Sequence, residues 1–209
     1  ADALRAVDRG RRGVTAPTTI LVARHADAEY ETHHWADEGG SLTATGRMQA
    51  RALGRSLAAR GVAHVWTSTY ARAVQTAELA AAELGVSVTT REALREFSVG
   101  SLEGSRAEDP FAPTYQAWLA GDLDRRLPGG ETGAELRRRM HHVLYEIAEH
   151  HVGESVLAIS HGGLMRLTLP LILTDEPIDP PARLGNCATV ELTIDGSHWR
   201  CVHWPTGDG

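Results

Sequence analysis

Residues 18–25 read Thr-Thr-Ile-Leu-Val-Ala-Arg-His, an apolar run that ends abruptly on a cation and an imidazole. A short run rich in β-branched residues, without polar alternation, is typical of a strand that is buried on both faces. Strands of this kind belong to parallel sheets that helices cover on both sides. Ligands of such sheets bind at the carboxyl ends of the strands, which is where Arg24 and His25 would lie.

Strand-like and helical segments alternate along the rest of the chain. Further strands are predicted over 62–67, 86–89, 155–160, 187–194 and 198–204. Helices, the first of them capped by Thr43, are predicted over 43–61, 70–84, 112–120, 132–151 and 164–173. This alternation predicts an α/β fold of three αβα layers, in which a mostly parallel central sheet carries helices on both faces.

Length and composition fit one globular domain. The chain has 209 residues, of which 42% are hydrophobic and 23% charged, ordinary values for a soluble protein. No shift in composition divides the sequence, so we expect a single domain over residues 18–205. Residues 1–17, which are rich in Arg and Gly, are expected to form a disordered tail.

Charge and hydropathy argue against several classes of partner. The formal net charge of -6 provides no global basic field for nucleic acid. No apolar run reaches the ~20 residues of a membrane span, and the N-terminal residues lack the apolar core of a signal peptide. Cys187 and Cys201 match neither a disulfide framework nor a zinc signature. The sequence therefore favours a cytoplasmic protein without nucleic-acid or membrane partners.

Three predicted strands lead to residues suited to phosphate chemistry. The first ends on Arg24 and His25, the second is followed by Arg72, and the fourth is followed by His161 and Gly162. All 21 cationic residues are Arg, so a phosphate site in this chain has to use Arg or His. Arg supplies planar, permanently charged donors that match phosphate oxygens, and backbone N–H groups at helix starts add to them.

A histidine among arginines can act as a nucleophile toward phosphorus. Neighbouring Arg charges disfavour the imidazolium, so His25 is expected to be neutral near pH 7. His161 can donate a hydrogen bond to a phosphoryl oxygen. Glu96, in the loop after the third strand, is the best-placed acid for the leaving alkoxide, with Glu103 of the same loop as the alternative. Phosphoryl transfer depends mainly on positioning and charge stabilisation, which these groups provide.

Six short motifs occur in order along the chain. They are Arg24-His25-Ala26, Leu-Thr-x-x-Gly-x-x-Gln-Ala at 42–50, Ser-x-x-x-Arg-Ala-x-x-Thr-Ala at 68–77, an acid loop at 94–104, Pro-Gly-Gly-Glu at 128–131 and Ser-His-Gly-Gly at 160–163. Each motif alone is weak evidence. Together they make residues 18–195 resemble the histidine phosphatase superfamily, the phosphoglycerate mutase-like proteins.

The resemblance implies the phosphoglycerate mutase-like fold and a role for each motif residue. His25 would be the phosphorylated nucleophile, and the phosphoryl group would be held by Arg24, Arg72 and His161. Glu96 would donate a proton to the leaving group and then activate water against the phosphohistidine. No metal and no organic cofactor is implied. Homodimers occur in the family, and the sequence leaves the oligomeric state open.

The sequence departs from the family pattern just after the nucleophile. Ala26 stands where glycine is usual; a methyl group there could crowd the phosphate loop, but related phosphatases tolerate it. Residues 27–40 lack the Asn that many members place a few residues beyond the histidine. The missing phosphate donor could be supplied by Thr32, His33, His34 or Ser41. We expect this region, together with an insert over 105–130, to govern the choice of substrate.

The predicted function is hydrolysis of a small phosphorylated metabolite through a phosphohistidine on His25. A mutase is the first alternative, but mutases of the family usually carry Glu-Arg in the acid loop and a nearby Lys, whereas Phe97 follows Glu96 here. A protein phosphohistidine phosphatase is the second, although such proteins tend to be shorter and to lack the insert at 105–130. A non-catalytic phosphate-binding protein is the third, and the intact residue set argues against it.

Several other residues have structural interpretations. Glu131 is expected to stabilise the start of a helix, and the three arginines at 137–139 are expected to form a solvated helix face. Trp35 could line a substrate mouth. Tyr115 and Trp118 fit that mouth and a buried helical stripe equally well.

Three pairs of adjacent histidines occur at 33–34, 141–142 and 150–151. Adjacent residues on a helix point in different directions, and no carboxylate or cysteine stands at a matching spacing. We therefore expect these histidines at the surface and no metal site.

Overall fold

The computed structural model describes residues 16–30, 39–104, 111–175, 178, 180 and 183–205. Its strands are β1 (Thr18–Arg24), β2 (Ala28–Glu29), β3 (Ser41–Leu42), β4 (Val62–Thr67), β5 (Val88–Thr90), β6 (Ser155–Ser160), β7 (Thr189–Asp195) and β8 (His198–His203). Its α-helices are α1 (Ala44–Ser56), α2 (Ala71–Leu84), α3 (Ala112–Leu119), α4 (Gly133–His150) and α5 (Gly162–Ile172). Of the tail predicted over residues 1–17, residues 1–15 lie outside the described part of the chain.

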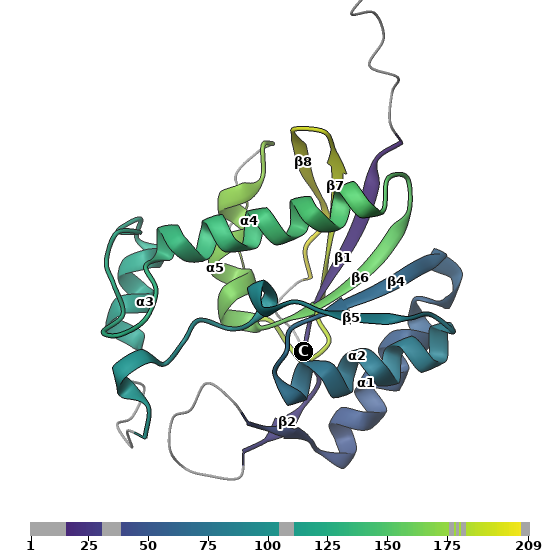
Figure 1. Ribbon diagram of the computed structural model, residues 1–209, viewed down its shortest axis with the longest axis horizontal. Coiled ribbons are helices and arrows are strands. Elements are labelled where there is room, and N and C mark those ends of the chain that lie inside the picture. The colour runs from purple at the N-terminus through teal and green to yellow at the C-terminus, as the bar shows by residue number, and fades with distance from the viewer. Residues whose placement is uncertain are drawn as a thin grey trace, which may run out of the picture.

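The centre of the molecule is a six-stranded sheet in the order β5-β4-β6-β1-β7-β8 (Figure 1). The first four strands in this order are parallel to one another. β7 is antiparallel to β1, and β8 is antiparallel to β7. The prediction of a mostly parallel sheet is therefore confirmed, with an antiparallel hairpin at one edge.

Both faces of the central strands are buried, because successive side chains of a strand point to opposite faces. In β1, Ile20 and Val22 join an apolar cluster with α4 and α5. Leu21 and Ala23 join a second cluster, formed with α1 and α2. Figure 1 shows the strands running between these two pairs of helices. Double burial explains why this segment of sequence has no polar alternation, and it confirms the three αβα layers.

The helix starts follow from local hydrogen bonds. Thr43 caps α1 as predicted, since its side chain accepts a backbone N–H of the first turn. α4 begins with a capping box in which Thr132 and Glu135 satisfy each other's backbone N–H groups. The residue predicted to stabilise this helix start, Glu131, instead forms an ion pair with Arg139.

Two strands begin later than predicted. The third predicted strand, over 86–89, is observed as β5 from Val88, because the N–H of Val86 bonds back to the carbonyl of Ala81 in α2. β7 begins two residues after Cys187, which has a left-handed backbone with φ of 59° and so interrupts the extended chain.

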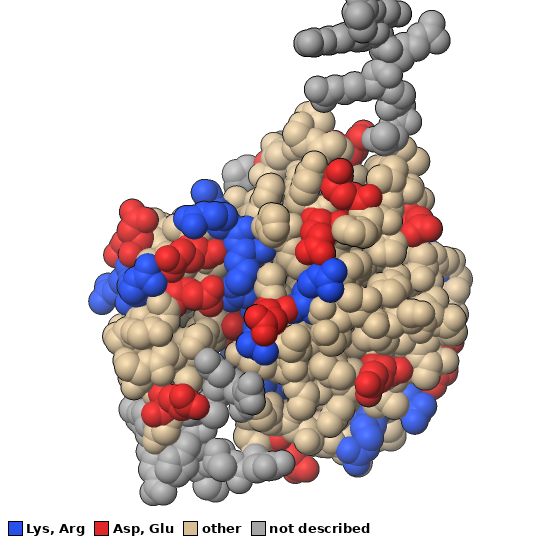
Figure 2. All heavy atoms as spheres, viewed as in Figure 1, with Lys and Arg blue, Asp and Glu red and all other residues tan. Residues whose placement is uncertain are grey.

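Acidic and basic side chains lie side by side on the face shown in Figure 2, which has no broad area of one sign. Surface ion pairs include Arg91–Glu146 and Arg126–Glu135, each with an N–O distance of 2.8 Å. Within the described ranges, no helix has both the length and the apolar character that a membrane crossing requires.

Candidate active site

The carboxyl ends of β1, β4 and β6 bring the predicted site residues together. Arg24, at the end of β1, pairs in register with Ser160, at the end of β6, so the residues that follow these two strands are neighbours. The rings of His25 and His161 lie 5.2 Å apart between centroids. Arg72 comes from the first turn of α2, which follows β4. The exposed fractions are 6% for His25, 5% for Arg72 and 1% for His161, so this is a buried constellation.

His25 is held in one tautomer. Its Nδ1 lies 2.7 Å from the carbonyl oxygen of Ala26, and because a carbonyl only accepts, we assign the ring proton to Nδ1. Nε2 then keeps its lone pair. The pKa of His25 is lowered to about 4, mainly by burial and further by the charges of Arg72 and Arg24. The ring is therefore neutral at pH 7, the form in which an imidazole is a nucleophile.

His161 is held through its other ring nitrogen, Nε2. The Ser68 hydroxyl accepts the N–H of Tyr70 at 3.3 Å, so its own proton is available for Nε2 of His161, which lies 2.8 Å away. We therefore assign the ring proton to Nδ1, which is buried and has no partner among the described residues. Burial, and then the charge of Arg72, hold the pKa of His161 well below its usual range. The neutral ring can donate one hydrogen bond from Nδ1.

Arg24 and Arg72 are each anchored through Nη1. Nη1 of Arg24 donates to the carbonyl of Leu184 at 2.6 Å, and Nη1 of Arg72 donates to that of Gly39 at 2.8 Å. The Arg72 guanidinium also lies over the ring of Tyr70, 4.8 Å from its centroid. Nε of Arg72 is buried and finds no acceptor within the described part of the chain. Each guanidinium is thus fixed in place while it keeps N–H groups that suit an anion.

Glu96 is bound at the start of α5. Its two carboxylate oxygens accept the N–H groups of Gly163 at 2.9 Å and Leu164 at 2.6 Å. Burial raises the pKa of Glu96 above its ordinary value and outweighs the backbone hydrogen bonds, which lower it. The alternative acid, Glu103, is exposed. Of these two carboxyl groups, Glu96 is therefore the one whose burial favours the protonated form.

The loop that carries Glu96 is held at three consecutive carbonyl groups. Ser160 donates its hydroxyl to the carbonyl of Leu94 at 2.9 Å. Arg139 of α4 donates to the carbonyls of Ala93 and Arg95. The expected solvated face at 137–139 is therefore wrong for Arg139, whereas Arg137 and Arg138 are exposed as expected.

The methyl group of Ala26 does not crowd the phosphate loop. It lies in a small buried apolar cluster with Leu42 and Ala50. The N–H of Ala26 donates to the hydroxyl of Thr76 at 3.0 Å, and that hydroxyl donates to the carbonyl of Arg72 at 2.7 Å. The methyl group faces α1 and fills space there, which fits the expected tolerance of alanine at this position.

The remaining predicted phosphate contacts stay predictions. Gly162 starts α5 beside Arg24, and a Cβ on Gly162 would lie 3.2 Å from Cδ of that arginine, so glycine suits the position. Ser41 lies in β3, and no hydrogen bond between its side chain and the other site residues is observed in the described part of the chain. Thr32 lies outside the described residues, as do His33, His34 and Trp35.

Tyr115 and Trp118 have different roles. Trp118 is 2% exposed, and its indole N–H donates to the carbonyl of Arg125 at 2.6 Å, so it belongs to the core. The hydroxyl of Tyr115 donates to the carbonyl of Gly163 at 3.0 Å, at the start of α5. Burial, and then the charge of Glu96, raise the pKa of Tyr115. Tyr115 therefore lies beside Glu96.

The histidine pairs are mostly at the surface. His141, His142 and His150 are exposed as expected. His151 is partly buried, because its ring accepts the indole N–H of Trp66 at 3.0 Å and pairs with Glu154 at 2.7 Å. In the described ranges, no group of three or more His, Cys, Asp or Glu residues is arranged to hold a metal ion.

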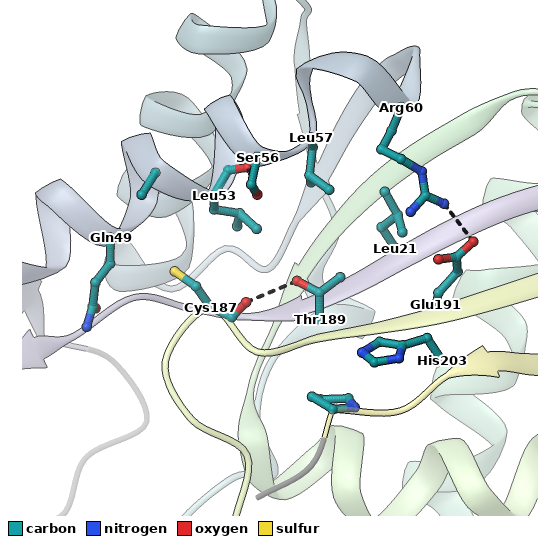
Figure 3. A pocket seen from close by; sticks show the side chains of 12 residues that line it. Leu21, Gln49, Leu53, Ser56, Leu57, Arg60, Cys187, Thr189, Glu191 and His203 are labelled. Carbon is teal, nitrogen blue, oxygen red and sulfur yellow. Dashed lines mark hydrogen bonds and ion pairs between the residues drawn. The ribbon is translucent and has the colours of Figure 1, made fainter. Parts of the chain in front are cut away.

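A cavity of about 500 Å³ lies beside α1 (Figure 3). Its lining comes from α1, β1, the loop before β7 and the β7–β8 edge. Figure 3 shows Gln49 and Cys187 on it, together with the ion pair between Arg60 and Glu191. None of the predicted catalytic residues lines this cavity, so it is separate from the site that the sequence predicts.

Sequence reasoning missed residues that support the site. Ser68 stands in a recognised motif, but nothing in the motif says that it sets the tautomer of His161. Asn186, whose amide donates to the carbonyl of His25 at 3.3 Å, carries no sequence signal. Arg139 is hidden among adjacent arginines, and its partner Glu131 lies in the turn before α4, so no helical spacing in the sequence links the two.

Comparison with protein families finds a match to the model of the histidine phosphatase superfamily (branch 1) over residues 20–206. The chain belongs to this superfamily. The matched range includes every residue of the site described above and confirms the resemblance seen in the sequence.

Relatives and solved structures carry both mutase and phosphatase names. "Probable phosphoglycerate mutase GpmB" from Yersinia enterocolitica is 30% identical over 192 residues, which cover 88% of this chain and 89% of that protein. The structure of a mycobacterial glucosyl-3-phosphoglycerate phosphatase has a TM-score of 0.74 at 23% identity and covers 90% of this chain and 98% of its own. The alpha-ribazole phosphatase from Shigella flexneri has a TM-score of 0.70 at 20% identity, with coverages of 90% and 96%. The structural likenesses confirm the phosphoglycerate mutase-like fold.

Proposed function

We propose that this protein is a phosphomonoesterase that hydrolyses a small phosphorylated metabolite through a phosphohistidine on His25. The observation that carries the proposal is a neutral, single-tautomer His25 set among Arg24, Arg72 and His161. Two buried N–H groups of these neighbours, Nε of Arg72 and Nδ1 of His161, lack partners among the described residues. An unpaired buried donor costs roughly 1–3 kcal/mol, and phosphoryl oxygens would supply the missing acceptors.

In the first step, Nε2 of His25 attacks phosphorus and the bond from phosphorus to the leaving oxygen breaks. Glu96 gives its proton to that oxygen, so the product leaves as a neutral alcohol. Arg24, Arg72 and His161 stabilise the negative charge on the equatorial oxygens. The raised pKa of Glu96 fits this role, because the carboxyl group keeps its proton at a higher pH than an ordinary glutamic acid.

In the second step, the Glu96 carboxylate takes a proton from water while that water attacks phosphorus. The bond between phosphorus and Nε2 of His25 breaks, and inorganic phosphate leaves. This step returns His25 to its neutral form and Glu96 to its protonated form, so the cycle needs no further proton source.

The direct test is hydrolysis of p-nitrophenyl phosphate in the presence of EDTA. We expect activity in the wild-type protein and a loss of about 10³-fold or more in His25→Ala. His198→Ala, which removes an exposed histidine at the start of β8, is the matched control and should retain activity. Phosphate binding without turnover on any phosphomonoester would favour the non-catalytic alternative instead.

Phosphoryl transfer between positions of phosphoglycerate is the second candidate, and the similarity to the protein named GpmB favours it. The residue after the acid, Phe97, and the absence of Lys from the whole chain favour hydrolysis. Incubation with 3-phosphoglycerate separates the two functions. Release of inorganic phosphate should exceed formation of the 2-isomer, and the reverse order would make the protein a mutase.

The substrate itself needs a panel of phosphorylated metabolites. Because the solved relatives are named for glucosyl-3-phosphoglycerate and alpha-ribazole phosphatases, compounds of these two kinds belong in the panel. The value of kcat/KM ranks the candidates, since it measures how strongly each transition state is stabilised.

A further inference from the structure

Arg139 of α4 forms hydrogen bonds to the backbone of the loop that carries Glu96. Nη1 of Arg139 donates to the carbonyl oxygens of Ala93 at 2.8 Å and of Arg95 at 2.9 Å. On its other edge, Nε and Nη2 donate to the two carboxylate oxygens of Glu131 at 2.8 and 2.9 Å. One guanidinium thus satisfies four acceptors, in the planar fork geometry that a lysine cannot reproduce.

The ion pair between Arg139 and Glu131 is partly buried, which restricts the motion of both side chains. The side chains of Arg139 and Glu131 are 20% and 29% exposed. Surface ion pairs contribute little, but a two-pronged pair with further backbone acceptors fixes the orientation of the guanidinium. Arg137 and Arg138, the two residues before it on α4, are exposed.

The turn that supplies Glu131 also contacts the far end of the acid loop. The N–H of Ser101 donates to the carbonyl of Pro128 at 2.9 Å. A Cβ on Gly100 would lie 2.3 Å from that same carbonyl oxygen, so the two backbones touch. Arg139 and Glu131 thereby join three parts of the chain: the acid loop, the turn at 128–131 and helix α4.

We propose that Arg139, oriented by Glu131, is a positioning residue that fixes Glu96 for proton transfer. The inference rests on the proposed function, in which Glu96 protonates the leaving group. Arg139 acts through the backbone, because it binds the carbonyl of Arg95, the residue directly before Glu96. A displacement of about 1 Å can cost a reacting group about 10²-fold in rate, so losing this anchor should weaken acid catalysis specifically.

The test compares Arg139→Met with Arg138→Met, its exposed neighbour, on phosphate esters of increasingly basic leaving groups. The series runs from p-nitrophenyl phosphate, whose leaving group needs little protonation, through phenyl phosphate to an alkyl phosphate. The quantity compared is kcat/KM, which reports transfer to His25 and is independent of the attack of water that all esters share. For Arg139→Met we expect kcat/KM on p-nitrophenyl phosphate to stay within about 3-fold of wild type and kcat/KM on the alkyl ester to fall by about 10²-fold. Arg138→Met should match wild type throughout.

Two further variants, Arg139→Lys and Glu131→Gln, test the same contacts. Arg139→Lys retains the charge but not the fork, so its loss of activity should grow with the basicity of the leaving group less steeply than that of Arg139→Met. This variant replaces Arg139→Met in the test if Arg139→Met does not fold. Glu131→Gln should also lose more activity on esters with more basic leaving groups. An equal loss of kcat/KM on all esters, or no loss of kcat/KM, in an active and folded Arg139 variant would overturn the positioning role alone. A wild-type protein that hydrolyses none of the esters would overturn the proposed function as well.

Discussion

At the scale of single residues, the chemistry depends on which ring nitrogen of each histidine carries the proton. The carbonyl of Ala26 keeps the proton of His25 on Nδ1, which leaves a lone pair on Nε2. The hydroxyl of Ser68 keeps the proton of His161 on Nδ1, which leaves an N–H to donate. In the proposed mechanism, the first ring would attack phosphorus and the second would stabilise the charge on the phosphoryl oxygens.

Ser68→Ala tests this assignment. Without the hydroxyl, Nε2 of His161 loses its donor, and the ring proton is no longer confined to Nδ1. We expect kcat to fall by about 5- to 10-fold, the equivalent of one hydrogen bond of about 1 kcal/mol. Nitrogen NMR of the His161 ring should report mixed tautomers. Ser56→Ala, at an exposed position at the end of α1, is the control. An unchanged kcat together with an unchanged tautomer would refute the role of Ser68.

At the scale of elements, the start of α5 organises the site. The first N–H groups of a helix have no partner within the helix, and its N-terminus favours negative charge. Here the N–H groups of Gly163 and Leu164 are satisfied by the Glu96 carboxylate, which comes from a separate loop. The same turn lets Arg24 pass over Gly162. One helix start therefore positions both Arg24, the proposed phosphate ligand, and Glu96, the proposed proton donor.

The close contact between α1 and α2 yields a stability prediction. A Cβ on Gly54 of α1 would lie 2.6 Å from the carbonyl oxygen of Ala80 in α2 and 2.8 Å from Cβ of Glu83. Alanine is the better helix former by about 1 kcal/mol, yet overpacking against backbone typically costs about 1–3 kcal/mol. We expect Gly54→Ala to lower the free energy of unfolding, measured in urea, and Ser56→Ala to leave it nearly unchanged. A Gly54→Ala protein as stable as wild type would show that the helices can separate freely.

The elements and the main site residues could be predicted because their signals are local. Strands buried on both faces read as unbroken apolar runs, and the site residues stand directly after them. The supporting contacts could not be predicted, since they join distant residues. Ser68 and His161 are 93 positions apart, and Ala93 and Arg139 are 46 apart. No pattern within a window of sequence encodes such a pair, so Arg139 was assigned to solvent.

At the scale of the whole molecule, the buried site couples folding to pH. His25 and His161 both have lowered pKa values in the folded protein, chiefly because of burial. In the unfolded chain a histidine titrates near pH 6.5. Below that pH the unfolded chain binds protons that the folded protein does not, so stability is full above about pH 6.5 and is lost as pH falls.

The size of the effect can be stated for His25, whose pKa falls from 6.5 to about 4 on folding. Between pH 7.5 and pH 5 this residue alone should remove about 2 kcal/mol of stability. We expect His25→Gln to show a smaller loss over that interval in urea unfolding experiments. His198→Gln, at an exposed position, should behave as wild type. If His25→Gln loses as much stability as wild type over that interval, the folded protein does not hold His25 neutral.

In the proposed mechanism, Nε2 of His25 carries the phosphoryl group. The most direct measurement is to mix the protein rapidly with p-nitrophenyl phosphate, quench it in alkali, which preserves phosphohistidine, and locate the phosphate by mass spectrometry and phosphorus NMR. Glu96→Gln, which slows the attack of water, should raise the amount that is trapped. The structure predicts phosphate on Nε2 of His25, because Nδ1 is held by the carbonyl of Ala26. Phosphate on Nδ1 or on another residue, or turnover without any trapped phosphoenzyme, would contradict it.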